Sequence, residues 1–214
     1  MAKHRALADL LARASSAHSR VPQRLRDVPI TADRERVLEL EALLHLRDGF
    51  KTLDGALIVR PSCTVASIRG ADDWNALTLW RGTWRHANKL YFFAEDVHGR
   101  QFGIHRRDIV TLDPATGAVE PWADDLEGWA AKAIASADAL GAARVRTWEA
   151  VHGPLGAHQR LQPKDPSALA LDLDTELRAR DDVDLMKRWA VWFRAHVANP
   201  EAPEVDPIAW WGED

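Results

Sequence analysis

The N-terminal part of the chain has apolar residues at the spacing of two amphipathic helices. In each stripe the apolar residues recur every three or four positions, so that they share one helix face. For the second helix, Thr31 can cap the N-terminus, Asp33 and Glu35 favour its dipole, and Gly49 is typical of a residue beyond the C-terminus. The two stripes are Leu7, Leu10, Leu11 and Ala14, and then Val37, Leu40, Leu43 and Leu44.

After Gly49 the pattern changes to short apolar runs bounded by turn residues, which is typical of β-strands. Asp113 can start a turn, Pro114 presets φ at the next position, and Gly117 supplies a left-handed residue before a returning strand. A second turn at 97–100 is predicted to join two further strands, so we expect an antiparallel meander. The predicted strands cover 55–60, 63–68, 90–94, 101–104 and 109–112.

Two more helices are predicted after the meander. Asp124 and Glu127 stand three positions apart, as in a capping box, and an apolar stripe follows them to about Gly141. Asp181 or Asp182 can start a last helix. The apolar residues of that last helix are Leu185, Met186, Trp189, Trp192, Phe193 and Val197.

Together these elements predict an α+β fold with an antiparallel-rich mixed sheet, flanked by helices and followed by an added C-terminal helix. Residues 153–166 contain glycines and prolines and are predicted to form an ordered loop. We expect an N-terminal helical extension over 1–30, an α+β core over 31–165, and a C-terminal helix with an acidic tail over 166–214.

The composition is that of an ordinary folded protein. Its 214 residues are 46% hydrophobic and 28% charged, which excludes global disorder. The single cysteine, Cys63, has no partner for an intramolecular disulfide, so we expect a reducing, cytoplasmic location and a small core residue within a strand. The apolar runs are far shorter than the ~20 residues that cross a bilayer, so no membrane partner is expected.

Ten tryptophans are many for this length. Trp74, Trp80 and Trp84 precede the strand at 90–94 and are expected to pack in the core. Trp210 and Trp211 follow a proline-broken acidic segment, and we expect them to anchor the tail on the domain.

The charge of the chain is unevenly distributed. The net charge is −4, but residues 1–36 carry eight Lys or Arg against four Asp or Glu. The body of the protein is therefore acidic, which argues against nucleic acid as its partner, since phosphate binding needs a cationic surface. An acidic body suits a basic protein partner.

The cluster that most suggests chemistry is Glu95, Asp96 and His98, with His105 nearby in sequence. Carboxylates and imidazole can hold a metal or move protons, so a metal-dependent enzyme is one alternative function. However, the spacing matches no metal signature, and acidic residues are common at turns. The chain also contains no nucleophile elbow, zincin motif or phosphate-binding loop. We therefore predict a structural role for this cluster, and no catalytic residue, metal or cofactor.

The run from Leu90 to Trp129 has a recognisable order: a hydrophobic strand ending in acidic residues, a glycine turn, a strand, an aspartate-threonine-glycine hairpin, and a helix opened by acidic residues. This order resembles the SUKH superfamily, and the similarity covers about 130 residues. The resemblance implies a mixed sheet flanked by helices, no enzymatic activity and, for bacterial members, immunity proteins that neutralise polymorphic toxins; fungal members regulate cell-wall synthesis. After Lys164 the chain departs from the pattern. Weaker similarity lies in 38–44, 48–50, 152–155 and 160–164.

The resemblance suggests a toxin as the protein partner. Toxins that cut nucleic acid are basic, so an acidic binding face would speed their capture. The other alternative is a regulatory or scaffold adaptor that binds several host proteins through its tail and N-terminal helix. Asp124 and Asp125 also have a competing role as helix caps. The candidate partner-binding residues are Glu95, Asp96, Asp113, Asp124 and Asp125.

Overall fold

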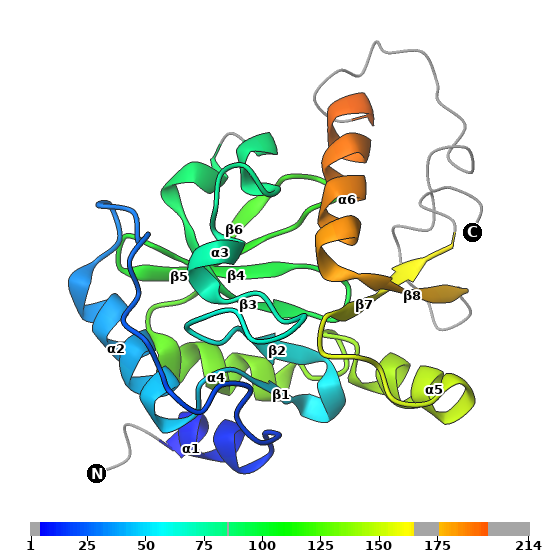
Figure 1. Cartoon of the computed structure of the whole chain (residues 1–214), viewed down its shortest axis with the longest axis horizontal. Coiled ribbons are helices and arrows are strands. Elements are labelled where there is room, and N and C mark those ends of the chain that lie inside the picture. The colour runs from blue at the N-terminus through cyan, green and yellow to red at the C-terminus, as the bar shows by residue number, and fades with distance from the viewer. Residues whose placement is uncertain (1–4, 85, 165–175, 197–214) are drawn as a thin grey trace.

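A six-stranded antiparallel sheet runs through the middle of the protein, with helices on both faces (Figure 1). The computed structural model describes residues 5–84, 86–164 and 176–196. Every strand of the large sheet pairs with the next one along the chain, so the sheet is a meander, as the predicted turns require. Its strands are β1 (Phe50–Thr52), β2 (Leu57–Val59), β3 (Tyr91–Asp96), β4 (Gln101–His105), β5 (Asp108–Leu112) and β6 (Val119–Ala123).

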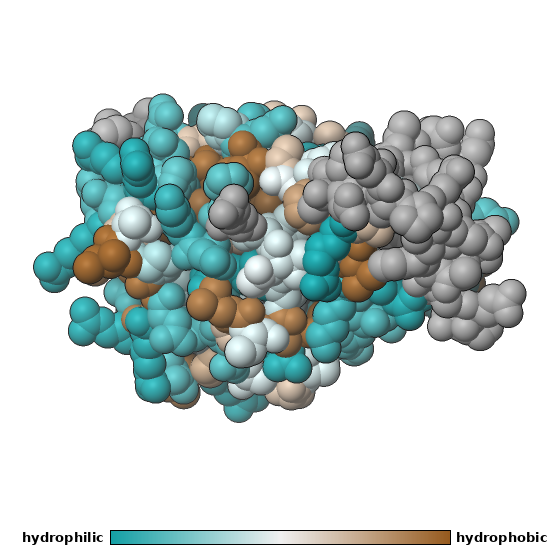
Figure 2. Space-filling model, turned by 90° about the horizontal axis from the view of Figure 1, so that it is seen from above, coloured by the Kyte–Doolittle hydropathy of each residue, from teal (hydrophilic) through white to brown (hydrophobic). Residues whose placement is uncertain are grey.

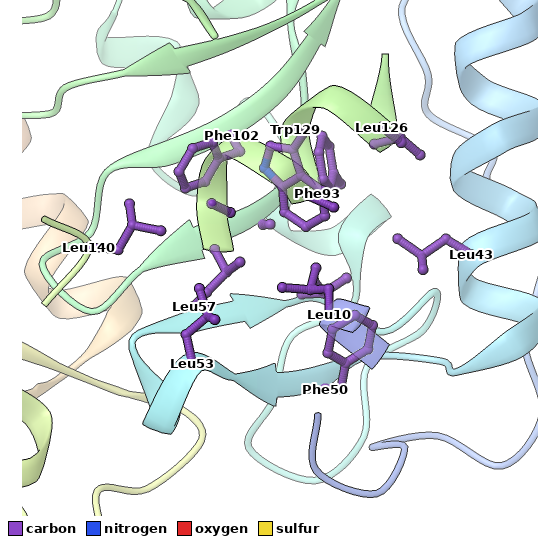
Figure 3. Close-up of a cluster of buried hydrophobic side chains, with 14 of the residues drawn as sticks. Leu10, Leu43, Phe50, Leu53, Leu57, Phe93, Phe102, Leu126, Trp129 and Leu140 are labelled. Carbon is purple, nitrogen blue, oxygen red and sulfur yellow. The ribbon is translucent and has the colours of Figure 1, made fainter. Parts of the chain in front are cut away.

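The first face of the sheet is covered by helices from both halves of the described chain. Their apolar side chains meet those of the sheet in one core cluster (Figure 3). The ring of Trp129 lies 5.2 Å from that of Phe93 and 6.2 Å from that of Phe102, centroid to centroid. The covering helices are α1 (Arg5–Ala12), α2 (Arg34–Leu46), α4 (Leu126–Ala135) and α5 (Ala142–His152).

The second face carries a tryptophan-rich cluster, as predicted for Trp74, Trp80 and Trp84. The ring centroid of Trp80 lies 5.2 Å from that of Trp74 and 5.6 Å from that of Trp84. Where this side of the molecule is coloured in Figure 2, hydrophobic residues form small areas separated by hydrophilic ones. The elements on this face are α3 (Ala71–Trp74), the short 3-10 turns η2 (Arg81–Thr83) and η3 (Ala87–Lys89), and α6 (Asp182–His196).

A separate hairpin leads into the C-terminal helix. Its strands are β7 (Gln159–Pro163) and β8 (Leu177–Asp181), and α6 begins directly after β8. The hairpin joins the main body through a hydrogen bond from the Leu161 amide to the Val97 carbonyl, 2.8 Å. No helix among the described residues is both long enough and apolar enough to cross a membrane.

Most predicted elements are confirmed. The antiparallel meander, the turn at 113–117 and four of the predicted helices are present. The helix boundaries differ slightly, since Asp33 rather than Thr31 caps α2 and Asp125 rather than Asp124 caps α4. In both cases the aspartate side chain accepts backbone N–H groups of the first turn.

Two predictions for individual segments are wrong, and one helix was not predicted. Residues 63–68 do not form a strand: Val65 and Ile68 make one isolated bridge, and Cys63 is only half-buried. The predicted loop at 153–166 contains β7. The helix α5 was not expected, because its stripe buries only Ala142 and Val145. Trp210 and Trp211 lie outside the described residues.

The N-terminal helix α1 is an integral part of the core rather than a loose extension. Leu10 is fully buried, and its carbonyl accepts a hydrogen bond from the Thr52 hydroxyl, 3.2 Å. The carboxylate of Glu127 accepts the amides of Ala6 and Leu7 at the helix N-terminus. The Arg47 guanidinium donates to carbonyls at the other end of the helix.

Removing the Leu10 side chain should therefore destabilise the whole protein. We expect Leu10→Ala to lower the free energy of unfolding by about 2–5 kcal/mol, because the substitution leaves a cavity in the core. Leu46→Ala is the matched control: Leu46 is 76% exposed, and its loss should change stability by no more than about 0.5 kcal/mol. Urea denaturation checks both. An unchanged midpoint for Leu10→Ala would mean that α1 is a detachable extension.

Candidate functional site

Two arginines and two carboxylates lie buried together between the sheet and the C-terminal helix. Arg60 follows β2, Glu95 belongs to β3, Arg160 to β7, and Asp182 opens α6; none is more than 1% exposed. Both guanidinium groups donate to the same oxygen of Glu95. Arg60 also donates to Asp182 at 2.9 Å, and Arg160 lies 3.7 Å from it. We call these four residues the buried ion cluster, and its formal charges sum to zero.

Neutral side chains add further contacts to this cluster, while Nε of Arg60 and Nε of Arg160 stay buried without a hydrogen-bond partner in the described structure. The Arg60 guanidinium lies over the Trp74 ring, 3.3 Å from the ring centroid. The Gln101 amide donates to the second oxygen of Glu95 at 3.0 Å, and the Trp74 indole donates to Gln101 at 2.8 Å. Both oxygens of Glu95 therefore have partners inside the protein.

Glu95 is thus a structural residue. Its side chain is fully buried and paired with two arginines, so it cannot contact a partner at the surface. This corrects the expectation that Glu95 contributes to a binding face. The predicted structural role of the acidic strand end is correct for this residue, but its partners, Arg60 and Arg160, lie 35 and 65 positions away in sequence.

Asp96, the next residue, points to a different place. It is also buried, at 2% exposure, yet one side of its carboxylate lines an open cleft. Its Oδ1 accepts the backbone amides of His98 and Arg100, both at 2.9 Å. Its Oδ2 lies 3.9 Å from Nε of Arg100. Burial raises the pKa of Asp96 to about 7, against the lowering effect of Arg100.

The cleft beside Asp96 has a volume of about 400 Å³ and brings together three aspartates from distant segments. Besides Asp96 they are Asp113, from the turn between β5 and β6, and Asp138, from the connection between α4 and α5. We call it the acidic cleft. Two cations, Arg100 and Arg144, also line it. Its apolar wall consists of Pro114, Ala115, Ala139, Pro163 and Trp189.

His98 contributes a neutral imidazole to the acidic cleft. Burial lowers the pKa of His98 to about 4, so the ring carries no charge at pH 7. Its Nδ1 lies 3.2 Å from the Leu161 carbonyl, and its Nε2 is buried without a hydrogen-bond partner in the described structure.

The remaining candidate residues do not share one surface. Asp113 is half-buried at the cleft, where its side chain accepts the amides of Ala115 and Thr116. Asp124 is exposed, and Asp125 caps α4 by accepting the Gly128 amide at 2.7 Å. Strand β6 separates Asp113 from this pair, so the two groups lie at opposite ends of the sheet. The prediction of one acidic face is therefore wrong.

No pattern in the sequence pointed to the other residues of the acidic cleft. Asp138 was expected to lie within a helix that in fact ends at Ala135. Arg144 lies in α5, which was not expected. Only the folded chain brings these residues beside Asp96.

The residues Glu95, Asp96 and His98 do not converge as metal ligands would. Successive strand residues point to opposite faces, so Glu95 faces the arginines while Asp96 faces the cleft. Within the ranges that the structure describes, no group of three or more His, Cys, Asp or Glu side chains is placed to hold a metal ion.

Comparison with known proteins adds information on the fold only. No family model matches the chain, and no curated protein matches it. A solved structure, the crystal structure of Atu4351 from Agrobacterium tumefaciens, is similar with a TM-score of 0.53 at 12% sequence identity. The match covers 84% of this chain and 86% of that one, so the similarity extends over most of both chains.

Breaking the buried ion cluster should be costly. In Glu95→Gln, two buried guanidinium groups share only Asp182, so we expect a loss of about 3–5 kcal/mol in the free energy of unfolding. The matched control is Glu176→Gln, which breaks the exposed pair with Lys164, 2.9 Å, and should cost about 1 kcal/mol or less. Chemical denaturation of both variants makes the comparison. Equal, small losses would contradict the structural role of Glu95.

Asp96 should make stability depend on pH in a direction opposite to most acids. Because its folded pKa of about 7 exceeds the ordinary value of 3.8, the folded state binds the proton more tightly, and stability falls as pH rises between these values. Asp96→Asn keeps an oxygen for the two amides. We expect this variant to be more stable than wild type by on the order of 2 kcal/mol at pH 8, with the difference vanishing near pH 4.

His98 changes the stability with pH in the opposite direction, but it is present in both wild type and Asp96→Asn. Its folded pKa of about 4 lies below the ordinary 6.5, so its contribution to stability is lost as pH falls through that range. The difference between wild type and Asp96→Asn therefore isolates Asp96. Thermal unfolding from pH 4 to 8 measures it, and a difference independent of pH would disprove the assignment.

Proposed function

We propose that this chain is a protein-binding module that captures a basic protein at the acidic cleft, as an immunity protein neutralising a toxin. The observation that carries the proposal is the convergence of Asp96, Asp113 and Asp138 on one cleft from three segments distant in sequence. Clefts of this kind bind by charge complementarity, which favours a cationic partner and repels acidic ones.

Electrostatics on a larger scale supports the same partner. The chain has a net charge of −4, and its acidic residues are concentrated after residue 36. An acidic body accelerates encounter with a basic protein and slows encounter with nucleic acid. The partner would therefore be selected by its charge before it reaches the cleft.

The cleft is bordered by elements that the buried ion cluster holds in place, which supports a preorganised binding site. The buried ion cluster lies directly beside it, because Glu95 and Asp96 are neighbours on β3. On the other side, Trp189 stands on α6, whose first residue, Asp182, belongs to the cluster. A preorganised site loses less entropy on association. The sequence resemblance to the SUKH superfamily adds the class of partner, a polymorphic toxin.

The test is affinity capture from the native organism with charge-reversed variants. Asp138→Lys places a cation at the mouth of the cleft with little risk to folding, since the Asp138 side chain is 79% exposed. Asp124→Lys is the matched control, an exposed aspartate at the other end of the sheet. We expect one basic protein to be captured by wild type and by Asp124→Lys, and to be lost with Asp138→Lys.

A growth assay then tests neutralisation. The captured protein expressed alone should arrest growth, and co-expression with wild type, but not with Asp138→Lys, should restore it. Capture of several host proteins unaffected by Asp138→Lys would favour the adaptor instead, and loss with Asp124→Lys alone would place binding at the opposite end of the sheet.

A further inference from the structure

Asp96 combines two features that a purely structural carboxylate does not need. It is 2% exposed and lines the acidic cleft, and its Oδ2 receives no hydrogen bond from the described residues. By contrast, both oxygens of its neighbour Glu95 are filled by arginine and glutamine donors. A carboxylate oxygen without a protein donor beside a cleft is an acceptor that a ligand can use.

No cation of the described chain fills this position. The closest, Arg100, has its Nε 3.9 Å from Oδ2, beyond hydrogen-bonding distance. Arg160 donates to Glu95 instead. The segments 165–175 and 197–214 contain neither lysine nor arginine. Oδ2 therefore keeps an acceptor position that a cation of another molecule can occupy.

The walls of the cleft suit a long side chain with a charged end. Pro114, Ala115, Pro163 and Trp189 offer apolar surface along which methylene groups can pack. Asp113 and Asp138 add acceptors at other points of the lining. A volume of about 400 Å³ lies within the range of pockets that enclose small ligands.

We propose that the acidic cleft is a recognition pocket for a single arginine side chain of the basic partner, whose guanidinium donates to Oδ2 of Asp96. Arginine fits better than lysine, because its planar fork of five donors can reach carboxylates in several directions while its stem stacks on aromatic surface. This proposal rests on the proposed function and names its central contact.

Such a contact has to depend on pH, since the carboxyl must lose its proton before it accepts the guanidinium. With the Asp96 pKa at about 7, the ionised fraction changes about tenfold between pH 6 and pH 8. Arg100 competes for the same oxygen, and His98 stays neutral over this range. Other charged groups surround Asp96. Arg100 belongs to the same turn, Glu95 lies on β3, and Arg160 lies on β7. The wall of the cleft adds Asp113, Asp138 and Arg144.

The experiment uses the full chain and Nα-acetyl-arginine amide as the probe, with binding followed by calorimetry and by NMR. The neutral isostere Nα-acetyl-citrulline amide is the control ligand, and Nα-acetyl-lysine amide tests the choice of arginine. We expect arginine to bind at pH 8 and about tenfold more weakly at pH 6. Asp96→Asn, which keeps the acceptor for both backbone amides, should lose at least about tenfold in affinity.

Two further variants sharpen the result. Arg100→Ala removes the competing cation and should bind the probe more tightly, whereas Asp124→Asn, at the other end of the sheet, should bind like wild type. Equal affinity for arginine and citrulline, or an Asp96→Asn variant that binds like wild type, would overturn the proposal. Stronger binding of lysine would overturn the choice of arginine.

The failure of this proposal can be told apart from failure of the proposed function. In one outcome, capture of the partner is lost with Asp138→Lys while Asp96→Asn changes neither the affinity for the probe nor the capture of the partner. In that case the cleft binds protein without an arginine in the pocket. If the probe binds through Asp96 but no basic protein is captured, the pocket is correct and the immunity function is wrong.

Discussion

The buried ion cluster is the interaction on which the rest of the structure depends. Apolar packing attaches helices to both faces of the sheet, but it is non-directional and does not fix where a C-terminal hairpin and helix must lie. The buried ion cluster is directional, because its ion pairs form only when the four side chains lie in one arrangement. These side chains are Arg60, Glu95, Arg160 and Asp182. Taking four charges out of water is expensive, and the ion pairs between the two arginines and the two carboxylates offset this cost. The cluster thus joins segments that the chain alone would leave independent.

The acidic cleft follows from this arrangement. Trp189 lies two helical turns after Asp182, so the ion pairs of Asp182 also place the wall of the cleft. On the strand side, alternation sends Glu95 towards the arginines and Asp96 towards the cleft. Two adjacent acidic residues therefore have different roles, one in holding the fold together and one in lining a site.

Local signals explain which parts of the fold the sequence could predict. The turn at Asp113 and Gly117, the caps and the apolar stripes are encoded within a few residues, and the meander they imply is present. Strand β7 carries no such signal, because its buried residues include Arg160 and Gln162, which become strand residues only beside Glu95 and β8. The same limit applies to the site. An acidic strand end is visible in the sequence, but burial and partners depend on contacts across more than a hundred positions.

The contrast between Glu95 and Asp96 separates folding from binding within a single strand. Glu95 has every acceptor filled, so its substitution should weaken the fold whatever the protein binds. Asp96 lines a cleft, and because burial raises its pKa to about 7, we expect its ionised form to make the free protein less stable than a neutral group would. Selection for folding alone would remove such a group, whereas proteins retain destabilising groups where function needs them. The proposed arginine contact would therefore explain why the chain keeps a carboxylate at this position.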